Sequence, residues 1–301
     1  MRQTAEGTHP DLYAAVNHIL SAGGKRVRPA VTLLTGRALH TQDQRVTKLA
    51  AAIELLHTAT LVHDDLIDGA LLRRGMSTLN SRWSPAATVL TGDFVFAQAA
   101  KLAAETDSVT VMKMFAETLS VLVGGEITQL FSAKGIADRK NYYNRIYAKT
   151  ASMFELATGA GAVLSPYADE LLIPAKKYGY AVGMAFQIVD EILDYTGKQS
   201  AVGKPVASDL RMGLITLPAL YFYEENPNDP NMQAVMNGKR NDNNVIDALV
   251  ADIRESGAVD AALEEAQGFI QDALDALKEY PATPERERLR DIAQYVVQRN
   301  V

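Results

Sequence analysis

Apolar residues recur at three- and four-residue spacing along most of the chain, which is typical of amphipathic helices. The segment 43–68 shows this spacing most clearly and contains neither Gly nor Pro. Similar patterns predict helices at 86–104, 108–131, 139–163, 168–196, 209–224, 243–256, 258–279 and 284–299. Pro29 predicts the first turn of one more helix. Short connections without strand alternation favour an all-α fold, a single bundle of mostly antiparallel helices.

Composition supports one globular domain. The chain has 301 residues, of which 48% are hydrophobic and 22% are charged, so it can bury a sizeable core. No linker is visible, and we expect a single domain over 1–301, with the more polar region 225–301 as a peripheral C-terminal helical cap. No run of about 18 apolar residues predicts a membrane span, and the N-terminus lacks a signal-peptide core.

Charge and cysteine content exclude several classes of function. The formal net charge is −6, which argues against a nucleic-acid partner. Cysteine is absent, which excludes disulfides, zinc–thiolate sites, iron–sulfur clusters and cysteine nucleophiles. This composition is compatible with the cytoplasm, where we expect the protein to be located.

The first candidate for chemistry is the cluster Asp64-Asp65-x-x-Asp68 at the end of an apolar helical segment. Positions 64 and 68 lie one helical turn apart, and His57 joins the same stripe seven residues earlier. The spacing predicts that the three carboxylates converge on one small volume.

A second cluster, Asp190-Glu191-x-x-Asp194, repeats this geometry on another apolar segment, with Gln187 on the same stripe. Like charges at this spacing repel each other, and divalent cations compensate such repulsion. Carboxylate oxygens suit Mg²⁺, which keeps several waters and bridges one or two carboxylates to substrate phosphates. A solvated helix end is the alternative for either cluster alone, but two matched clusters favour metal binding.

Cations are concentrated near both clusters. Lys25 and Arg28 belong to a Gly-Gly-Lys-Arg-Val-Arg-Pro stretch before a predicted helix, and Arg73-Arg74 follows the first cluster. Lys149-Thr150 lies in another helix, and Lys204 follows the second cluster. Each basic pair alone could be a surface patch, but arginine beside metal-binding carboxylates offers a planar fork for phosphate. The combination predicts a diphosphate site. Nucleotide P-loop, HExxH and GxSxG motifs are absent.

These stretches resemble the motifs of trans-polyprenyl diphosphate synthases, in the same order and at similar separations. They are GGKRVRP, HTATLVHDDLID followed by RRG, YAKTAS, FQIVDEILD and GKPVASDLRMGLITLP. The resemblance covers about residues 20–225. It implies an all-α isoprenoid synthase fold around a deep apolar cavity, a homodimer, and head-to-tail condensation of isopentenyl diphosphate with an allylic diphosphate. It also implies Mg²⁺ as cofactor, as three ions with bound diphosphate, and allows peripheral membrane contact for product release.

The resemblance assigns roles by motif. Asp64, Asp68 and Asp190 would bind Mg²⁺, and Asp65 and Asp194 would support or share the coordination. The allylic diphosphate would be held by Arg73, Lys149, Thr150, Gln187 and Lys204. Isopentenyl diphosphate would be held by Lys25, Arg28, His57 and Arg74. Glu191 stands where many relatives carry Asp, so its carboxylate lies about one methylene further out and its ligation of metal stays open.

Product length would be set by what blocks the apolar tunnel beneath the first cluster. Bulky aromatics four or five residues before the first Asp stop growth early in the family, whereas this chain has the small residues Thr60 and Ala59 there. Leu56 lies one turn further back. We expect a product longer than farnesyl diphosphate, as a medium- to long-chain all-trans polyprenyl diphosphate. Phe94 or Phe96 on another helix, or the dimer interface, could set the floor instead.

Three alternatives stay open. The chain could be a catalytic subunit that is silent without a hetero-oligomeric partner, or a short-chain geranylgeranyl or farnesyl diphosphate synthase. A class I terpene cyclase would share the helical cavity, but it would not need Lys25, Arg28 and Arg74, so the sequence disfavours it.

Overall fold

The computed structural model of the chain describes residues 9–41, 43–73, 75–131, 135, 137–196 and 206–299. These residues form two compact units, each built from segments distant in sequence. The first unit comprises Met1–Glu117, Leu156–Ile173 and Pro281–Arg286, and the second comprises Thr118–Glu155, Pro174–Tyr280 and Glu287–Val301. The first acidic cluster lies in the first unit and the second cluster lies in the second unit.

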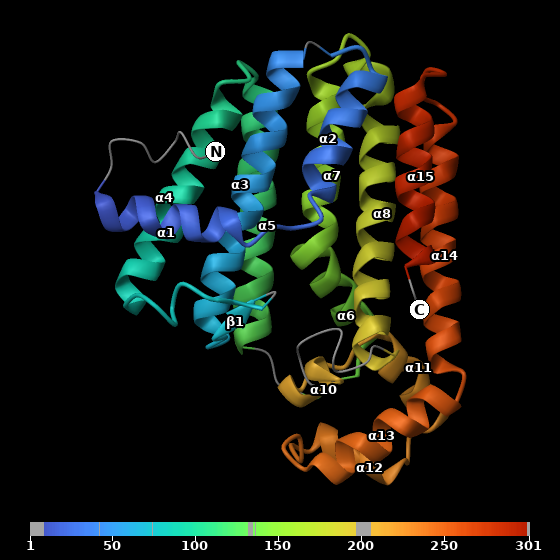
Figure 1. The fold of residues 1–301 in the computed structure, drawn as a ribbon. Coiled ribbons are helices and arrows are strands. Elements are labelled where there is room, and N and C mark those ends of the chain that lie inside the picture. The colour runs from blue at the N-terminus through green and yellow to red at the C-terminus, as the bar shows by residue number, and fades with distance from the viewer. Residues whose placement is uncertain are drawn as a thin grey trace. The chain divides into compact units, whose positions relative to one another are not determined.

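The chain folds almost entirely into helices (Figure 1). The first elements are α1 (Pro10–Ser21), α2 (Val27–Ala38), α3 (Asp43–Ile67), the strands β1 (Leu72–Arg73) and β2 (Met76–Ser77), α4 (Pro85–Ala104) and α5 (Val109–Phe131). They are followed by α6 (Arg139–Ile146), the π-helix η2 (Tyr147–Ala151), α7 (Ser152–Val163), α8 (Ala168–Thr196) and α10 (Ser208–Met212). The last are α11 (Leu217–Glu225), α12 (Pro230–Met236), α13 (Asn243–Glu255), α14 (Ala258–Leu277) and α15 (Pro284–Gln298). The predicted all-α fold class is confirmed.

Several predicted helices differ from the observed ones. The segment 139–163 is interrupted by the π-helix η2, and the segment 209–224 is broken between α10 and α11, where Gly213 adopts a φ of 82°. Helices α1 and α12 were not predicted, although each begins with a proline in its first turn. The two strands pair antiparallel as a small hairpin that alternation could not reveal at this length.

In the first unit, α3 packs against both α2 and α4, and Figure 1 shows α3 and α4 side by side. Leu49, Ile53 and Leu56 are fully buried at the i, i+4, i+7 spacing of one helix face. Gly92 of α4 allows a close approach, since a Cβ there would overlap the imidazole of His63 on α3. This packing fixes the end of α3 that carries the first acidic cluster.

In the second unit, residues 174–196 of α8 are the apolar centre. Gly183 of α8 lies against η2, because a Cβ at this position would stand 2.5 Å from Cα of Ala151. The Tyr178 hydroxyl donates to the Leu289 carbonyl at 2.8 Å and joins α8 to α15, which runs beside it in Figure 1. The second acidic cluster therefore lies on a helix held by both η2 and the C-terminal helix. Across the described ranges, no helix combines the length and hydropathy that crossing a membrane requires.

Candidate active site

The first cluster lies at the C-terminal end of α3 and just beyond it. Asp64 is half-buried, Asp65 is buried and Asp68 is exposed directly after the helix ends. Within the described residues, no three carboxylate or imidazole side chains come close enough to hold a metal ion together. The predicted convergence of the three carboxylates therefore stays a prediction. Neighbouring helical residues differ by about 100° in direction, so the side chains of Asp64 and Asp65 leave α3 in different directions.

Asp65 is bound by Arg73, which the small hairpin brings back to the end of α3. Nε of Arg73 lies 2.8 and 2.9 Å from the two carboxylate oxygens of Asp65. The hairpin is fixed to the helix end because the amide of Ala70 donates to the Asp65 carbonyl at 2.9 Å. An arginine that we expected to bind phosphate is thus positioned by a carboxylate that we expected to support metal. Arg74 lies outside the described residues.

The cations expected for isopentenyl diphosphate lie on α2 and α3 of the same unit. Nη1 of Arg28 lies 3.2 Å from Nε2 of His57, so the structure brings these two predicted residues together. Lys25 is exposed and lies two residues before α2. Arg26 forms an ion pair with Glu54 of α3, which ties the start of α2 to α3. Arg26, a residue with no predicted role, anchors the segment that carries Lys25 and Arg28.

The predicted chain-length residues also lie on α3. Ala59 and Leu56 are buried, and Thr60 is half-buried with its hydroxyl donating to the His57 carbonyl at 2.9 Å. The hydroxyl of Thr60 is therefore satisfied by its own helix. Phe96 packs against Phe115 with ring centroids 6.2 Å apart, as an ordinary aromatic core contact of the first unit.

In the second unit, Asp190 on α8 is half-exposed and is bound by the buried Arg299. Nη1 of Arg299 donates to Oδ1 of Asp190 at 2.8 Å. Arg299 follows α15 and is separated from Asp190 by 109 residues. Its position could have been suspected from sequence, because it continues the apolar stripe of Leu289, Ala293 and Val296. An arginine on a core-facing stripe implies a buried partner.

Glu191 points into the protein. The hydroxyl of Tyr142 donates to Oε2 of Glu191 at 2.7 Å, and Nε2 of Gln187 lies 3.3 Å from its other oxygen. Burial raises the pKa of Glu191 to about 7 and the charge of Asp209 adds to this, although Arg145, Tyr142 and Gln187 oppose the shift. A fully buried carboxylate with these partners holds neighbouring side chains of the site in place.

The network continues to η2. The hydroxyl of Thr150 donates to Oε1 of Gln187 at 2.7 Å, which joins two residues predicted to hold the allylic diphosphate. Lys149, beside Thr150, is exposed. Single π-helical turns are rare and frequently occur at functional sites, so η2 is itself a signal that the sequence did not provide.

Asp194 binds the start of α10. Its Oδ1 accepts from the hydroxyl of Ser208 at 3.0 Å, and its Oδ2 accepts from the amide of Asp209 at 3.1 Å. The N-cap residue Ala207 has no side-chain acceptor, so Asp194 supplies the cap from α8. Lys204 lies in the segment before α10, outside the described residues.

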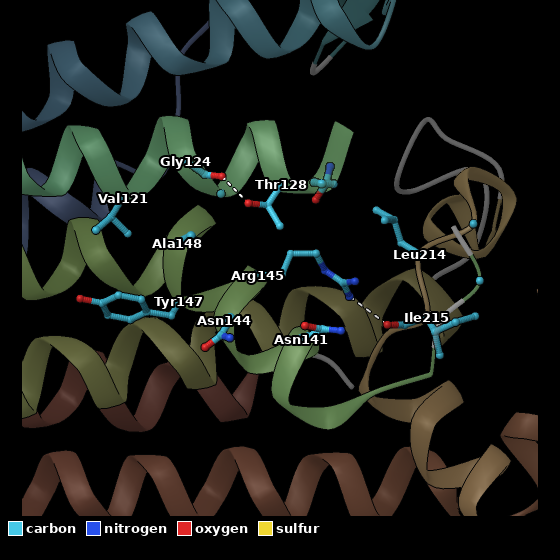
Figure 2. A pocket seen from close by; sticks show the side chains of 14 residues that line it. Val121, Gly124, Thr128, Asn141, Asn144, Arg145, Tyr147, Ala148, Leu214 and Ile215 are labelled. Carbon is cyan, nitrogen blue, oxygen red and sulfur yellow. Dashed lines mark hydrogen bonds between the residues drawn. The ribbon is translucent and has the colours of Figure 1, made fainter. Parts of the chain in front are cut away.

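A cavity of about 420 Å³ lies in the second unit beside η2 (Figure 2). Nη2 of Arg145 donates to the Ile215 carbonyl at 2.9 Å, and the hydroxyl of Thr128 donates to the Gly124 carbonyl at 2.7 Å. Asn141 and Asn144 add amide groups to the same wall. The cavity is lined by none of the predicted site residues, so it is distinct from the tunnel expected beneath the first cluster.

Known proteins match the chain over nearly its whole length. A family model described as polyprenyl synthetase matches residues 9–253. The chain belongs to the polyprenyl synthetase family. Family members are Mg²⁺-dependent prenyltransferases, and this chain is accordingly a prenyltransferase.

Individual polyprenyl synthetases support this membership. The chain is 33% identical to octaprenyl diphosphate synthase of Escherichia coli (strain K12), over 94% of this chain and 88% of that protein. It is 34% identical to heptaprenyl diphosphate synthase component 2 of Geobacillus stearothermophilus, over 100% and 93%. The crystal structure of a polyprenyl synthase from Caulobacter crescentus CB15, complexed with calcium and isoprenyl diphosphate, matches with a TM-score of 0.92 and 34% identity, covering 100% and 92% of the chains.

The donor chemistry of this polyprenyl synthetase fits Mg²⁺. Asp64, Asp68 and Asp190 present carboxylate oxygens that are at least partly exposed, which hard divalent cations prefer. Among the described residues no closed cage of three acidic side chains forms, and Mg²⁺ does not require one when substrate phosphates and waters complete its shell. Glu191 fits a ligand role less well, because it is buried and accepts hydrogen bonds from Tyr142 and Gln187.

Proposed function

We propose that the chain condenses isopentenyl diphosphate head-to-tail with an allylic diphosphate, farnesyl or geranylgeranyl diphosphate, to give a medium- to long-chain all-trans polyprenyl diphosphate. The observation that carries this proposal is the pair of acidic clusters, each on an apolar helix with predicted phosphate-binding groups beside it. Similarity to octaprenyl and heptaprenyl diphosphate synthases over at least 94% of the chain supports the same reaction class.

The proposal gives the predicted site residues distinct tasks. Asp64, Asp68 and Asp190 hold Mg²⁺, as three ions once diphosphate is bound. Arg73, positioned by Asp65, binds the allylic diphosphate together with Lys149, Thr150, Gln187 and Lys204. Lys25, Arg28, His57 and Arg74 bind isopentenyl diphosphate. Asp194 supports the second cluster by fixing the start of α10.

The chemistry follows from these charges. When bound, Mg²⁺ neutralises the charge that develops on the departing diphosphate. Arg73 and Lys149 add fixed positive charge at the same group, so the allylic C1–O bond breaks with its electron pair leaving on the diphosphate. The isopentenyl double bond then forms the new C–C bond, and a proton is lost to the released diphosphate. Apolar surroundings exclude water, which would trap the carbocation as an alcohol.

Chain length is proposed to depend on the small residues Ala59 and Thr60, which lie one helical turn from Leu56. A graded test enlarges Ala59. Ala59→Phe should shorten the dominant product and Ala59→Val should shorten it less, because the larger ring blocks more of the tunnel. Identical product lengths for wild type and both folded variants would contradict this assignment.

The activity test is a direct assay of the purified chain with isopentenyl diphosphate, farnesyl diphosphate and Mg²⁺. Dephosphorylated products are separated by chromatography, and a ladder ending at one dominant polyprenol longer than farnesol is expected. Cyclic hydrocarbons formed without isopentenyl diphosphate would contradict the proposal and favour a cyclase. Turnover that appears only after cell extract is added would identify a catalytic subunit that needs a partner, as the name of the Geobacillus component 2 protein suggests for that relative.

A homodimer is part of the proposal. Val123, Ile127, Leu130 and Phe131 form an exposed apolar row on α5, with relative exposures of 48%, 52%, 60% and 81%. Their i, i+4, i+7, i+8 spacing places them on one helix face, and such a face is typical of an interface. Light scattering of the purified chain should give twice the mass of 32.7 kDa, and a monomer would contradict the homodimer. Cytoplasmic location and peripheral membrane contact stay predictions.

A further inference from the structure

Arg299, directly after α15, reaches the second acidic cluster. Leu289, Ala293 and Val296 of α15 are buried, and Arg299 continues this stripe three residues further along. The side chain of Arg299 is only 6% exposed. A guanidinium placed this deeply needs an anionic partner, since an unpaired buried charge is strongly destabilising.

Arg299 is held in one orientation by contacts on several sides. Its guanidinium lies over the ring of Phe186, with 4.2 Å from its central carbon to the ring centroid. Nε donates to the Val296 carbonyl at 3.2 Å and Nη2 lies 3.4 Å from the Phe186 carbonyl. The remaining nitrogen, Nη1, donates to Oδ1 of Asp190 at 2.8 Å. The backbone and the aromatic ring therefore fix the donor that meets Asp190.

The orientation of Asp190 is set by the groups that hold its carboxylate, and Arg299 is one of them. The side chain of Asp190 is 41% exposed, so an unrestrained carboxylate there would sample several rotamers. Carboxylates that bind metal are usually hydrogen-bonded by a second protein group, and removing that group lowers metal affinity by roughly 10- to 100-fold. Arg299 has the geometry of such a group.

We propose that Arg299 is a positioning residue, which orients the Asp190 carboxylate for divalent cations and thereby makes the C-terminal helix part of the metal site. The proposal rests on the proposed function, in which Asp190 binds Mg²⁺. A guanidinium also repels a cation, but at a carboxylate exposed by 41% solvent screens this repulsion. The fixed orientation therefore outweighs the repulsion, and loss of Arg299 should weaken metal binding.

The test measures Mn²⁺ binding to the full-length protein in the presence of inorganic diphosphate, from the electron paramagnetic resonance signal of free Mn²⁺. The variant Asp190→Asn shows which Mn²⁺-binding sites depend on Asp190. Arg299→Gln removes the guanidinium but keeps much of the side-chain length. Arg290→Gln is the matched control, because Arg290 is a half-exposed arginine of the same helix that pairs with Glu287. Melting temperatures of all variants report on folding.

Some Mn²⁺ sites are expected to be lost in Asp190→Asn. We expect Arg299→Gln to lower the Mn²⁺ affinity of these sites by roughly 10- to 100-fold, and Arg290→Gln to leave that affinity unchanged. A purely structural role would lower the melting temperature without this loss of affinity. Unchanged or tighter Mn²⁺ binding in folded Arg299→Gln would overturn the inference while leaving the proposed function intact. If Asp190→Asn lost no sites, the metal assignment and the inference would both fail.

Arg299→Lys keeps the test decisive if Arg299→Gln does not fold. Lysine retains the charge but lacks the plane that stacks on Phe186 and the fork that meets two carbonyls. We expect its Mn²⁺ affinity to lie between those of wild type and Asp190→Asn. Wild-type affinity in Arg299→Lys would contradict the positioning role.

Discussion

The two acidic clusters share one sequence spacing but have different surroundings. In the first unit, Asp68 is exposed, Asp64 is half-buried, and Asp65 is bound by a nearby arginine, Arg73. In the second unit, each acidic residue has its own partner from a distant segment. Asp190 is bound by Arg299, Glu191 by Tyr142, and Asp194 by Ser208.

This difference shows that spacing decides which face of a helix a carboxylate occupies, whereas neighbours decide what it does there. Asp64 and Asp190 hold the same first position and both remain partly exposed. The second positions, Asp65 and Glu191, are both buried, but one faces a guanidinium and the other a phenol. We therefore expect the first positions to serve catalysis and the second positions to serve orientation.

The largest expected effect is on turnover after Asp64→Asn in the first cluster. The variant should lose roughly 10²–10³-fold in kcat, because one group that stabilises charge in the transition state is removed. Asp169→Asn is the control, since Asp169 is an exposed acidic residue in the first turn of α8. Initial rates at saturating substrates and Mg²⁺ decide the matter, and a loss below about fivefold would remove Asp64 from the catalytic set.

The next effect is the pH dependence of stability in the second cluster. The pKa of Glu191 is about 7 in the folded protein, against an ordinary value of 4.5, so its stabilising contribution is complete below about pH 4.5 and is lost as pH rises through 7. Between pH 5 and pH 8 the loss should be about 2 kcal/mol. Urea unfolding of metal-free wild type and Glu191→Gln at both pH values isolates the contribution of Glu191 to the unfolding free energy. The same pH dependence of stability in the two proteins would contradict the predicted loss.

A smaller effect should follow from the cap that Asp194 provides for α10. Asp194→Ala removes both bonds and should cost about 1 kcal/mol of unfolding free energy, as loss of a helix cap does. Ser208→Ala removes one of the two bonds and should cost less. Denaturant unfolding of both variants checks the order, and equal stability of Asp194→Ala and wild type would show that α10 does not need this cap.

The smallest effect concerns the pair Asp65–Arg73. Arg73 is 34% exposed, so solvent screens the pair and its coupling should be about 1 kcal/mol or less. A double-mutant cycle with Asp65→Asn and Arg73→Gln measures this coupling, which should weaken further in high salt. Coupling well above this value, insensitive to salt, would mean that the first cluster is as enclosed as the second.

Local patterns predicted much of this organisation. The 3.6-residue periodicity located α3, α4, α5 and α8 to within a few residues, because each is long and buries one apolar face. Family resemblance assigned Arg28 and His57 to one ligand, and the structure places their side chains in contact, although their role stays a prediction. Short elements such as α1 and α12 lacked enough periodic residues to be recognised.

Partners from distant segments could not be predicted in the same way. Arg299 and Tyr142 reach the second cluster from 109 and 49 residues away, and helical spacing carries no information about such pairs. The π-helix η2 was missed because its sequence has ordinary helix propensity, whereas its geometry depends on close packing against Gly183. The environment of each carboxylate is therefore a tertiary property.

The central claim is that adjacent acidic residues in the second cluster have different roles. The most direct measurement compares kcat of folded Asp190→Asn and Glu191→Gln under saturating substrates and Mg²⁺. Asp190→Asn should lose roughly 10²–10³-fold, because it removes a metal-binding group. Glu191→Gln should lose less than about tenfold, because it alters a hydrogen bond to Tyr142 worth about 1 kcal/mol. Equal losses in the two variants would contradict the account.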